Sequence, residues 1–159
     1  MCADITQFLS VSEITSKPVR GLGLYVKDTG TIRGRGVFAG RKYAKGELVE
    51  VAPVIVFNAC VLPRIIANIL YHWEQQTKEP NTRAIALGYG SLYNHDNPSN
   101  LSYTVDAAAR VIRYTAVRQI AADEELTINY NSANGHCADA DDLWFERHGM
   151  EQCPRLQGD

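Results

Sequence analysis

The sequence predicts a mostly β protein with α insertions, and three observations support this fold class. Short apolar runs alternate with glycine-containing turns between residues 19 and 58. Two alternating runs, LSYTVD and RVIRYTAV, flank the short connection Ala107-Ala108-Ala109 and predict a hairpin. Helical spacing of apolar residues is confined to one inserted segment and one terminal segment. Together these patterns favour short sheets carrying two helical additions.

Size and composition restrict the class of protein. The chain has 159 residues, 45% of them apolar and 21% charged, which is typical of one globular domain. A net charge of −2 gives no basic surface for direct nucleic-acid binding. No apolar run has transmembrane length, so no membrane partner is expected. Because the first residues do not resemble a signal peptide, we expect an intracellular location, nuclear or cytoplasmic, or the host nucleus for a viral or bacterial effector.

The cysteines predict neither disulfides nor a metal site. Cys2, Cys60, Cys137 and Cys153 are widely spaced, without a CxxC pair, which favours a reducing compartment. His136, Cys137, His148 and Cys153 are residue types that bind zinc, but their spacing matches no compact ligand pattern. We therefore expect no metal.

The amino-terminal half is predicted to hold an arm and several strands. Residues 1–18 have weak periodicity and are expected to form an N-terminal arm. VRGLGLYVKD is expected to be a strand interrupted by glycine, and four glycines surround the apolar pair in GTIRGRGVFAG. Lys45-Gly46 predicts a turn before a further strand. Pro53 predicts that this strand lies at a sheet edge or is broken there.

Two helices are expected. Residues 63–77 place apolar side chains on one helical face, with Pro63 in the first turn and Lys78-Glu79-Pro80-Asn81 as the stop. The apolar positions are Ile65, Ile66, Ile69, Leu70 and Trp73. The segment DADDLWFERHG has aspartates at its start and glycine at its end, which predicts a short terminal helix bearing Trp144 and Phe145.

A polar stretch lies between an apolar run and a strand. GSLYNHDNPSN, residues 90–100, is rich in turn-forming residues and is either a surface turn or a binding loop. In the later segment EELTINY, the alternation predicts that Tyr130 faces the same side as Leu126 and Ile128.

Three segments in this order resemble motifs of the SET-domain protein lysine methyltransferases. They are GRGVFA with Lys45-Gly46-Glu47, then Asn94-His95 through Asn100, and finally Glu124-Glu125-Leu126 followed by Tyr130. The resemblance covers about residues 20–150. The segment ALGYGSLYNH and a short aromatic tail are most similar to compact viral-type SET histone methyltransferases that lack a post-SET zinc site.

The resemblance implies a domain plan and a fold. The SET domain is expected at residues 19–131 with a helical insert at 58–84, followed by a flanking segment at 132–159. The implied fold is β-clip-like, with several short sheets and a knot-like C-terminal crossing. A homodimer is also expected from this resemblance.

The resemblance also implies S-adenosyl-L-methionine as cofactor and a lysine of a protein, such as a histone tail, as substrate. The expected cofactor-binding residues are Gly34, Arg35, Gly36, Asn94, His95, Trp144 and Phe145. The expected substrate channel is formed by Tyr89, Tyr93, Ile128 and Tyr130. Tyr130 is the expected catalytic residue, whose hydroxyl would align the methyl donor and the amine.

This sequence departs from the family pattern at several positions. Asn97 replaces a cysteine that often joins a zinc cluster, and no CxC follows Tyr130, so Trp144 and Phe145 are expected to replace that tail. Ile128 occupies a position often held by tyrosine or phenylalanine, and it leaves the number of methyl groups undetermined.

Plainer interpretations stay open for each residue. The glycines also suit a tight turn or bulge, and Tyr130 also suits a core position with one hydrogen bond. Two other functions are a catalytically inactive SET-fold module that binds a lysine-rich peptide or the cofactor, and a hydrolase using His95 and Asp96. No nucleophile motif GxSxG supports the hydrolase.

Overall fold

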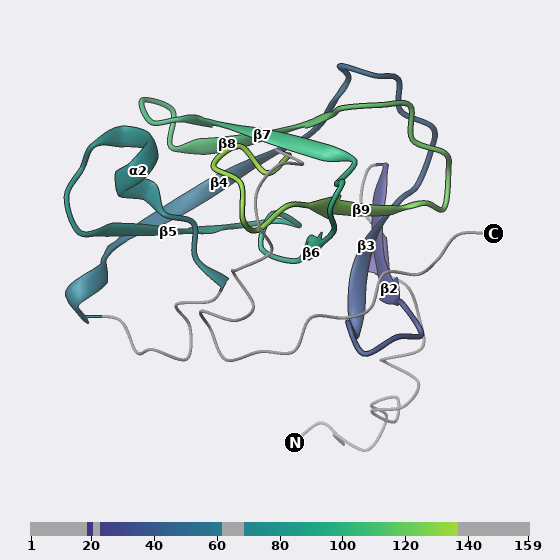
Figure 1. The fold of residues 1–159 in the computed structure, drawn as a ribbon, viewed down its shortest axis with the longest axis horizontal. Coiled ribbons are helices and arrows are strands. Elements are labelled where there is room, and N and C mark those ends of the chain that lie inside the picture. Colours follow the sequence, from purple (N-terminus) through teal and green to yellow (C-terminus); the bar gives the residue numbers. More distant parts are fainter. Residues whose placement is uncertain (1–18, 21–22, 62–68, 137–159) are drawn as a thin grey trace, which may run out of the picture.

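The computed structural model describes residues 19–20, 23–61 and 69–136, and most of its regular elements are strands (Figure 1). The strands are β1 (Val19–Arg20), β2 (Leu24–Asp28), β3 (Arg35–Ala39), β4 (Leu48–Asn58), β5 (Thr82–Ala86), β6 (Asn94–His95), β7 (Leu101–Asp106), β8 (Val111–Ala116) and β9 (Glu125–Ile128). The helical elements are the 3-10 turn η2 (Ala59–Val61) and the helix α2 (Trp73–Thr77). The mostly β prediction is confirmed. The expected N-terminal arm and the aromatic terminal helix lie outside the described residues.

The strands form two sheets. One has the order β1-β2-β3-β9-β6 and the other the order β5-β4-β8-β7. Neighbouring strands are antiparallel except β6 and β9, which are parallel. In Figure 1, β2 and β3 stand steeply beside the flatter strands of the other sheet. The late strand β9 thus lies between two segments that precede it in the chain, β3 and β6.

The predicted hairpin is present as β7 and β8. Its register runs from Leu101 opposite Ala116 to Asp106 opposite Val111. The Asp106 carboxylate accepts hydrogen bonds from the Ala109 N–H and from the Arg113 guanidinium. The turn is therefore closed by a side chain, as is usual for aspartate before a tight connection.

The prediction for Pro53 is wrong. The strand β4 continues from Leu48 to Asn58 and lies inside its sheet between β5 and β8. Pro53 marks a change of partner, because the residues up to Pro53 pair with β8 and those from Val54 onward pair with β5. Proline lacks an N–H to donate, and here it stands where one ladder gives way to the other.

The prediction of a long helix over residues 63–77 is also wrong for residues 69–72, the described part that precedes α2. Tyr71 forms a bridge with Ala84, with N···O distances of 2.8 and 3.0 Å in the two directions. The helix α2 begins only at Trp73, whose side chain is buried, and ends before Lys78 in the left-handed conformation. Because the backbone of Tyr71 bonds to β5, it is unavailable to a helix. Residues 62–68 lie outside the described part.

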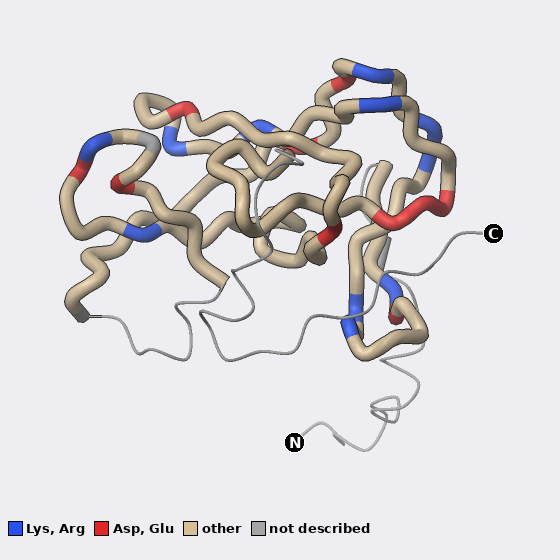
Figure 2. The backbone as a smooth tube through the Cα atoms, viewed as in Figure 1, with Lys and Arg blue, Asp and Glu red and all other residues tan. Residues whose placement is uncertain are grey.

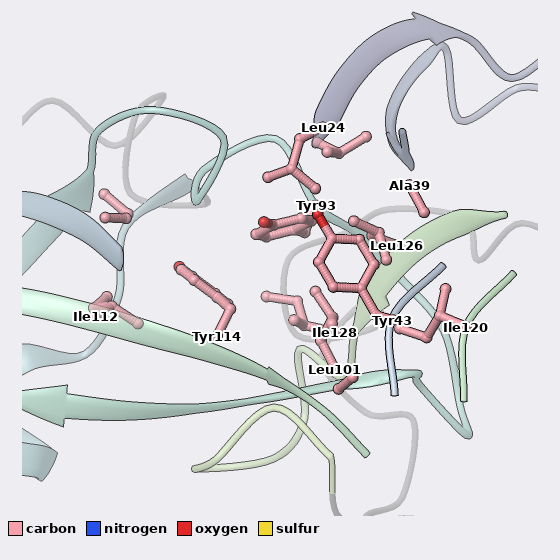
Figure 3. Close-up of a cluster of buried hydrophobic side chains, with 14 of the residues drawn as sticks. Leu24, Ala39, Tyr43, Tyr93, Leu101, Ile112, Tyr114, Ile120, Leu126 and Ile128 are labelled. Carbon is pink, nitrogen blue, oxygen red and sulfur yellow. The ribbon is translucent and has the colours of Figure 1, made fainter. Parts of the chain in front are cut away.

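The apolar core lies between the two sheets (Figure 3). Leu126 and Ile128 of β9 are buried as expected, and Tyr130 packs against the same cluster from the turn that follows. Thr127 and Asn129 are buried as well, with exposed fractions of 3% and 1%. The strand β9 is therefore covered on both faces, so its alternation does not separate core from solvent.

Candidate active site

Residues 94–100 of the polar stretch are bonded to β9. Asn94 and His95 pair in parallel with Thr127 and Ile128. Asn100 is buried, and its side-chain amide donates to the Glu125 carbonyl at 2.7 Å while its oxygen accepts the Thr127 N–H at 2.9 Å. The side chains of this loop thus satisfy backbone groups of a buried strand, which explains so polar a sequence inside a small domain.

The side chain of Asn94 joins all three motifs. Its Nδ2 donates to the Arg35 carbonyl at 3.2 Å and to Glu125 Oε1 at 2.8 Å. Both partners accept hydrogen bonds only, so the amide nitrogen must face them. The amide oxygen Oδ1 consequently points away from these two acceptors.

The glycines of the first motif have different surroundings. Gly36 is buried, and a Cβ there would lie 2.5 Å from Glu125 Oε1 and 3.0 Å from Asn94 Nδ2. Glycine at this position therefore allows the contact between Asn94 and Glu125. Gly34 has a φ of +69° and open space where a Cβ would stand. Its conformation favours glycine, and its N–H and carbonyl are bonded to Thr31 and Thr29.

Tyr130 is held at both its backbone and its hydroxyl. Its N–H donates to Nδ1 of His95 at 3.0 Å, and its hydroxyl donates to the Tyr93 carbonyl at 2.7 Å. The rings of Tyr130 and His95 lie 5.3 Å apart at 57°. Burial raises the pKa of Tyr130 to about 12, so its phenol is neutral at physiological pH.

An ion pair flanks this phenol. Arg33 Nη1 lies 3.7 Å from Glu125 Oε2, and the two side chains are only 14% and 19% exposed. Arg33 lowers and Glu125 raises the pKa of Tyr130, so these charges act in opposite directions on a shift set mainly by burial. Sequence analysis did not single out Arg33, which lies just before the glycine motif, or assign a role to Glu125.

A group of buried and partly buried tyrosines extends from the site. The Tyr71 hydroxyl donates to the Gly90 carbonyl at 2.7 Å and accepts from the Tyr114 hydroxyl at 2.7 Å. The Tyr93 and Tyr114 rings lie 4.8 Å apart, and Figure 3 shows both side chains in the buried cluster. Tyr71 was not predicted as a site residue, because it fell within the helix expected over residues 63–77. Its extended backbone beside β5 brings it toward the site instead.

Among the expected channel residues, Tyr93 has a buried side chain that is bonded to a carboxylate. It is 2% exposed, and its hydroxyl donates to Glu50 Oε2 at 2.7 Å. Ile128 is also buried, at 5% exposed, while Tyr89 is half-buried. Tyr93 therefore meets Tyr130 through its backbone carbonyl, and its hydroxyl faces a carboxylate that sequence analysis did not identify.

The structure brings most predicted site residues together. Gly36, Asn94 and Tyr130 are linked to one another through Glu125, Tyr93 and His95. Trp144 and Phe145 lie outside the described residues, as do Cys137, His148 and Cys153. Within residues 19–20, 23–61 and 69–136, no group of three or more His, Cys, Asp or Glu could hold a metal ion. None of the helices in that part is long and apolar enough to cross a membrane.

Comparison with known proteins agrees with this arrangement. The SET domain family model matches residues 34–131. A Schizosaccharomyces pombe histone-lysine N-methyltransferase, specific for lysine 37 of histone H3, is 31% identical over 134 residues, which cover 81% of each chain. The family match includes the glycine motif, the Asn94-His95 loop and Tyr130.

Solved structures agree at the level of the fold. The crystal structure of a Plasmodium falciparum protein proposed to be a histone methyltransferase aligns with a TM-score of 0.58 at 26% identity, covering 70% of this chain and 95% of that one. A humanized mutant of the Chaetomium thermophilum Polycomb Repressive Complex 2 aligns at 0.59 and 18% identity, covering 72% of this chain and 16% of that one. The chain therefore belongs to the SET-domain family of protein-lysine methyltransferases.

Proposed function

We propose that this protein transfers a methyl group from S-adenosyl-L-methionine to the side-chain amine of a lysine in a histone. The observation that carries the proposal is the position of the Tyr130 phenol. It is fixed by the Tyr93 carbonyl and by His95, beside the Asn94–Glu125 contact. A neutral phenol held in one direction suits a reaction that depends on aligning two reactants.

The chemistry of the surrounding groups fits the cofactor. When bound, S-adenosyl-L-methionine supplies a methyl group on a positively charged sulfur. Asn94 Oδ1 would accept from its ammonium group, since Nδ2 is already committed to Arg35 and Glu125. The open side of Gly34 would let the backbone approach closely. His95 would contribute backbone groups from the same loop, and Trp144 and Phe145 would complete the site.

The Tyr130 hydroxyl would orient the lysine amine. Its hydrogen is committed to the Tyr93 carbonyl, so its oxygen meets an incoming amine as an acceptor. A lysine amine has a pKa of about 10.4 in water, and entry into apolar surroundings lowers that pKa. The amine would therefore arrive neutral after giving its proton to solvent. Buried Ile128 would supply part of the apolar wall, with Tyr89 nearer the surface.

The histone substrate is supported by the Schizosaccharomyces pombe relative, which acts on lysine 37 of histone H3. The acidic residues 123–125, just before and at the start of β9 (Figure 2), add little attraction for a basic tail, because Glu124 and Glu125 already pair with Arg118 and Arg33. A histone substrate agrees with the expected nuclear location. The inactive binding module is less well supported, because Tyr130 is present and fixed.

Transfer of labelled methyl groups tests the proposal. The chain would be incubated with labelled S-adenosyl-L-methionine and, separately, histone H3, histone octamers, nucleosomes and a ribosomal protein mixture. We expect label on a histone lysine, located by mass spectrometry. Tight cofactor binding without label in any mixture would favour the binding module instead. The expected homodimer stays a prediction, which light scattering at two concentrations would test.

A further inference from the structure

We propose that Glu50 is a positioning residue for the methyl transfer, acting on Tyr130 through the segment 88–93. The inference rests on the proposed function, because it assigns Glu50 to the same site. Glu50 lies on β4, where a register shift between Leu48 and Glu50 interrupts the pairing with β8. An acidic residue is unexpected in so apolar a strand, LVEVAPVIVFN, and its contacts give it a role.

Glu50 binds the segment at two points. Its Oε1 accepts the backbone N–H of Tyr89 at 2.8 Å, and its Oε2 accepts the hydroxyl of Tyr93 at 2.7 Å. The carboxylate therefore spans the segment that leads into the Asn94-His95 loop. Burial raises the pKa of Glu50, while the two donors oppose that rise. The two donors thus compensate for the partial burial of this carboxylate.

Gly88 leaves room in this segment for the Glu50 carboxylate. Gly88 has a φ of +71°, and a Cβ on it would lie 2.5 Å from Glu50 Oε1. Any other residue at position 88 would be strained and would push against the carboxylate. Further along the segment, the Gly90 carbonyl accepts from the Tyr71 hydroxyl. Glu50 and Tyr71 therefore hold the segment at separate points.

The segment transmits this restraint to the catalytic tyrosine. The Tyr93 side chain is held by Glu50 and packs against Tyr114, and the Tyr93 carbonyl accepts the Tyr130 hydroxyl. A backbone carbonyl cannot pass on a proton, so Glu50 is not a general base for the lysine. Its effect on the reaction is to fix the direction of the Tyr130 hydroxyl, where small displacements are costly.

Three variants test this inference against a matched control. Glu50→Ala removes both acceptors, Glu50→Gln retains one acceptor for Tyr89 and a donor for Tyr93, and Tyr93→Phe removes one of the two donors. Glu47→Ala is the control, since that glutamate also accepts one backbone N–H and one side-chain donor, from Ala44 and Arg41, but at the surface. Thermal unfolding would be measured for each variant to check that it is folded at the assay temperature.

We expect the Glu50 variants to change kcat while leaving peptide and cofactor binding nearly unchanged. Glu50→Ala should lower kcat by roughly ten- to a hundredfold, while the peptide KM and cofactor Kd change by less than about threefold. Glu50→Gln should recover most of the lost kcat, Tyr93→Phe should fall between them, and Glu47→Ala should resemble the wild type. An unchanged kcat in Glu50→Ala would overturn the inference. So would equal losses in Glu50→Gln and Glu50→Ala, because the charge would then matter more than the position.

Hydrogen exchange gives a readout that does not need activity. The amides of residues 88–93 should exchange faster in Glu50→Ala than in Glu50→Gln, Glu47→Ala or the wild type. Unchanged exchange in Glu50→Ala would overturn the restraint itself. If the wild-type protein transfers no methyl group but the exchange result is as expected, the proposed function fails while the restraint by Glu50 stands.

Discussion

The amide Nδ2 of Asn94 lies 2.8 Å from Glu125 Oε1, a contact between two motifs separated by 31 positions. The same nitrogen reaches the Arg35 carbonyl in the glycine motif. One side chain therefore fixes the relative positions of β3, β6 and β9, and the parallel pairing of β6 with β9 continues that contact. The predicted cofactor site is thus built from segments that are distant in sequence and adjacent in space.

Replacing Asn94 with alanine should weaken cofactor binding. The change removes the acceptor Oδ1 and the hydrogen bonds that Nδ2 donates to the Arg35 carbonyl and Glu125. We expect Kd for S-adenosyl-L-methionine to rise about tenfold or more, which corresponds to about 1.4 kcal/mol. Isothermal titration calorimetry measures this directly. Asn58→Ala is the control, because Asn58 lies on the exposed end of β4, and equal Kd values for the two variants would argue against the role of Asn94.

Replacing Gly36 with alanine should lower stability and disturb the same contact. The added Cβ would meet Glu125 Oε1 at 2.5 Å and Asn94 Nδ2 at 3.0 Å. Overpacking of this kind costs about 1–3 kcal/mol of unfolding free energy, which urea denaturation would detect. Gly30→Ala is the control, since it has a positive φ but open space. It should cost stability through its backbone alone and leave cofactor Kd unchanged, whereas Gly36→Ala should change both.

The Tyr71 hydroxyl should contribute measurably to stability. Tyr71→Phe removes the donor to the Gly90 carbonyl and the acceptor for Tyr114. We expect a loss of about 1–2 kcal/mol in the free energy of unfolding, because these groups are buried. Tyr103→Phe provides the comparison, since its hydroxyl has no hydrogen-bond partner within the described part of the chain. Similar stabilities for the two variants would mean that the tyrosine network contributes little.

The pKa of Tyr130 predicts how methyl transfer depends on pH. Burial favours the neutral phenol and raises its pKa to about 12. The folded value exceeds the unfolded value of about 10, so the stabilisation from burying the neutral phenol is complete below pH 10 and is lost as the pH rises toward 12. Because the Tyr130 phenol stays neutral below pH 10, the rate of methyl transfer should rise with deprotonation of the substrate lysine up to about pH 10. The measurement is the difference in phenolate absorbance between the wild type and Tyr130→Phe, which should be zero up to that pH. A difference that appears near pH 9 would contradict the raised pKa of Tyr130.

Local patterns predicted the elements whose structure is decided by nearby residues. The hairpin of β7 and β8 follows from alternation and a short connection, and its turn is closed by Asp106 within the same segment. Gly46 was expected in a turn, and it has a φ of +83°. The family motifs predicted which distant segments belong together, and the contacts of Asn94 agree with that grouping.

Patterns failed where tertiary contacts outweighed local preference. Apolar spacing at residues 65–73 predicted a helix, but Tyr71 bonds to Ala84 and is extended. Thr127 alternates with the apolar residues of β9, yet it is buried and Asn100 accepts a hydrogen bond from its N–H. Glu50 could have been noticed as a single charge in an apolar strand, but its partners lie about forty positions later and cannot be read from spacing.

Methyl transfer by the Tyr130→Phe variant is the most direct test of the central claim. The substitution removes the hydroxyl that bonds to the Tyr93 carbonyl and keeps the ring beside His95. Single-turnover transfer from labelled S-adenosyl-L-methionine to histone H3 would be measured together with cofactor Kd. We predict a fall in rate of about a hundredfold or more with Kd changed less than about threefold. Wild-type transfer by Tyr130→Phe, with the same Kd, would contradict the assignment of Tyr130 as the catalytic residue.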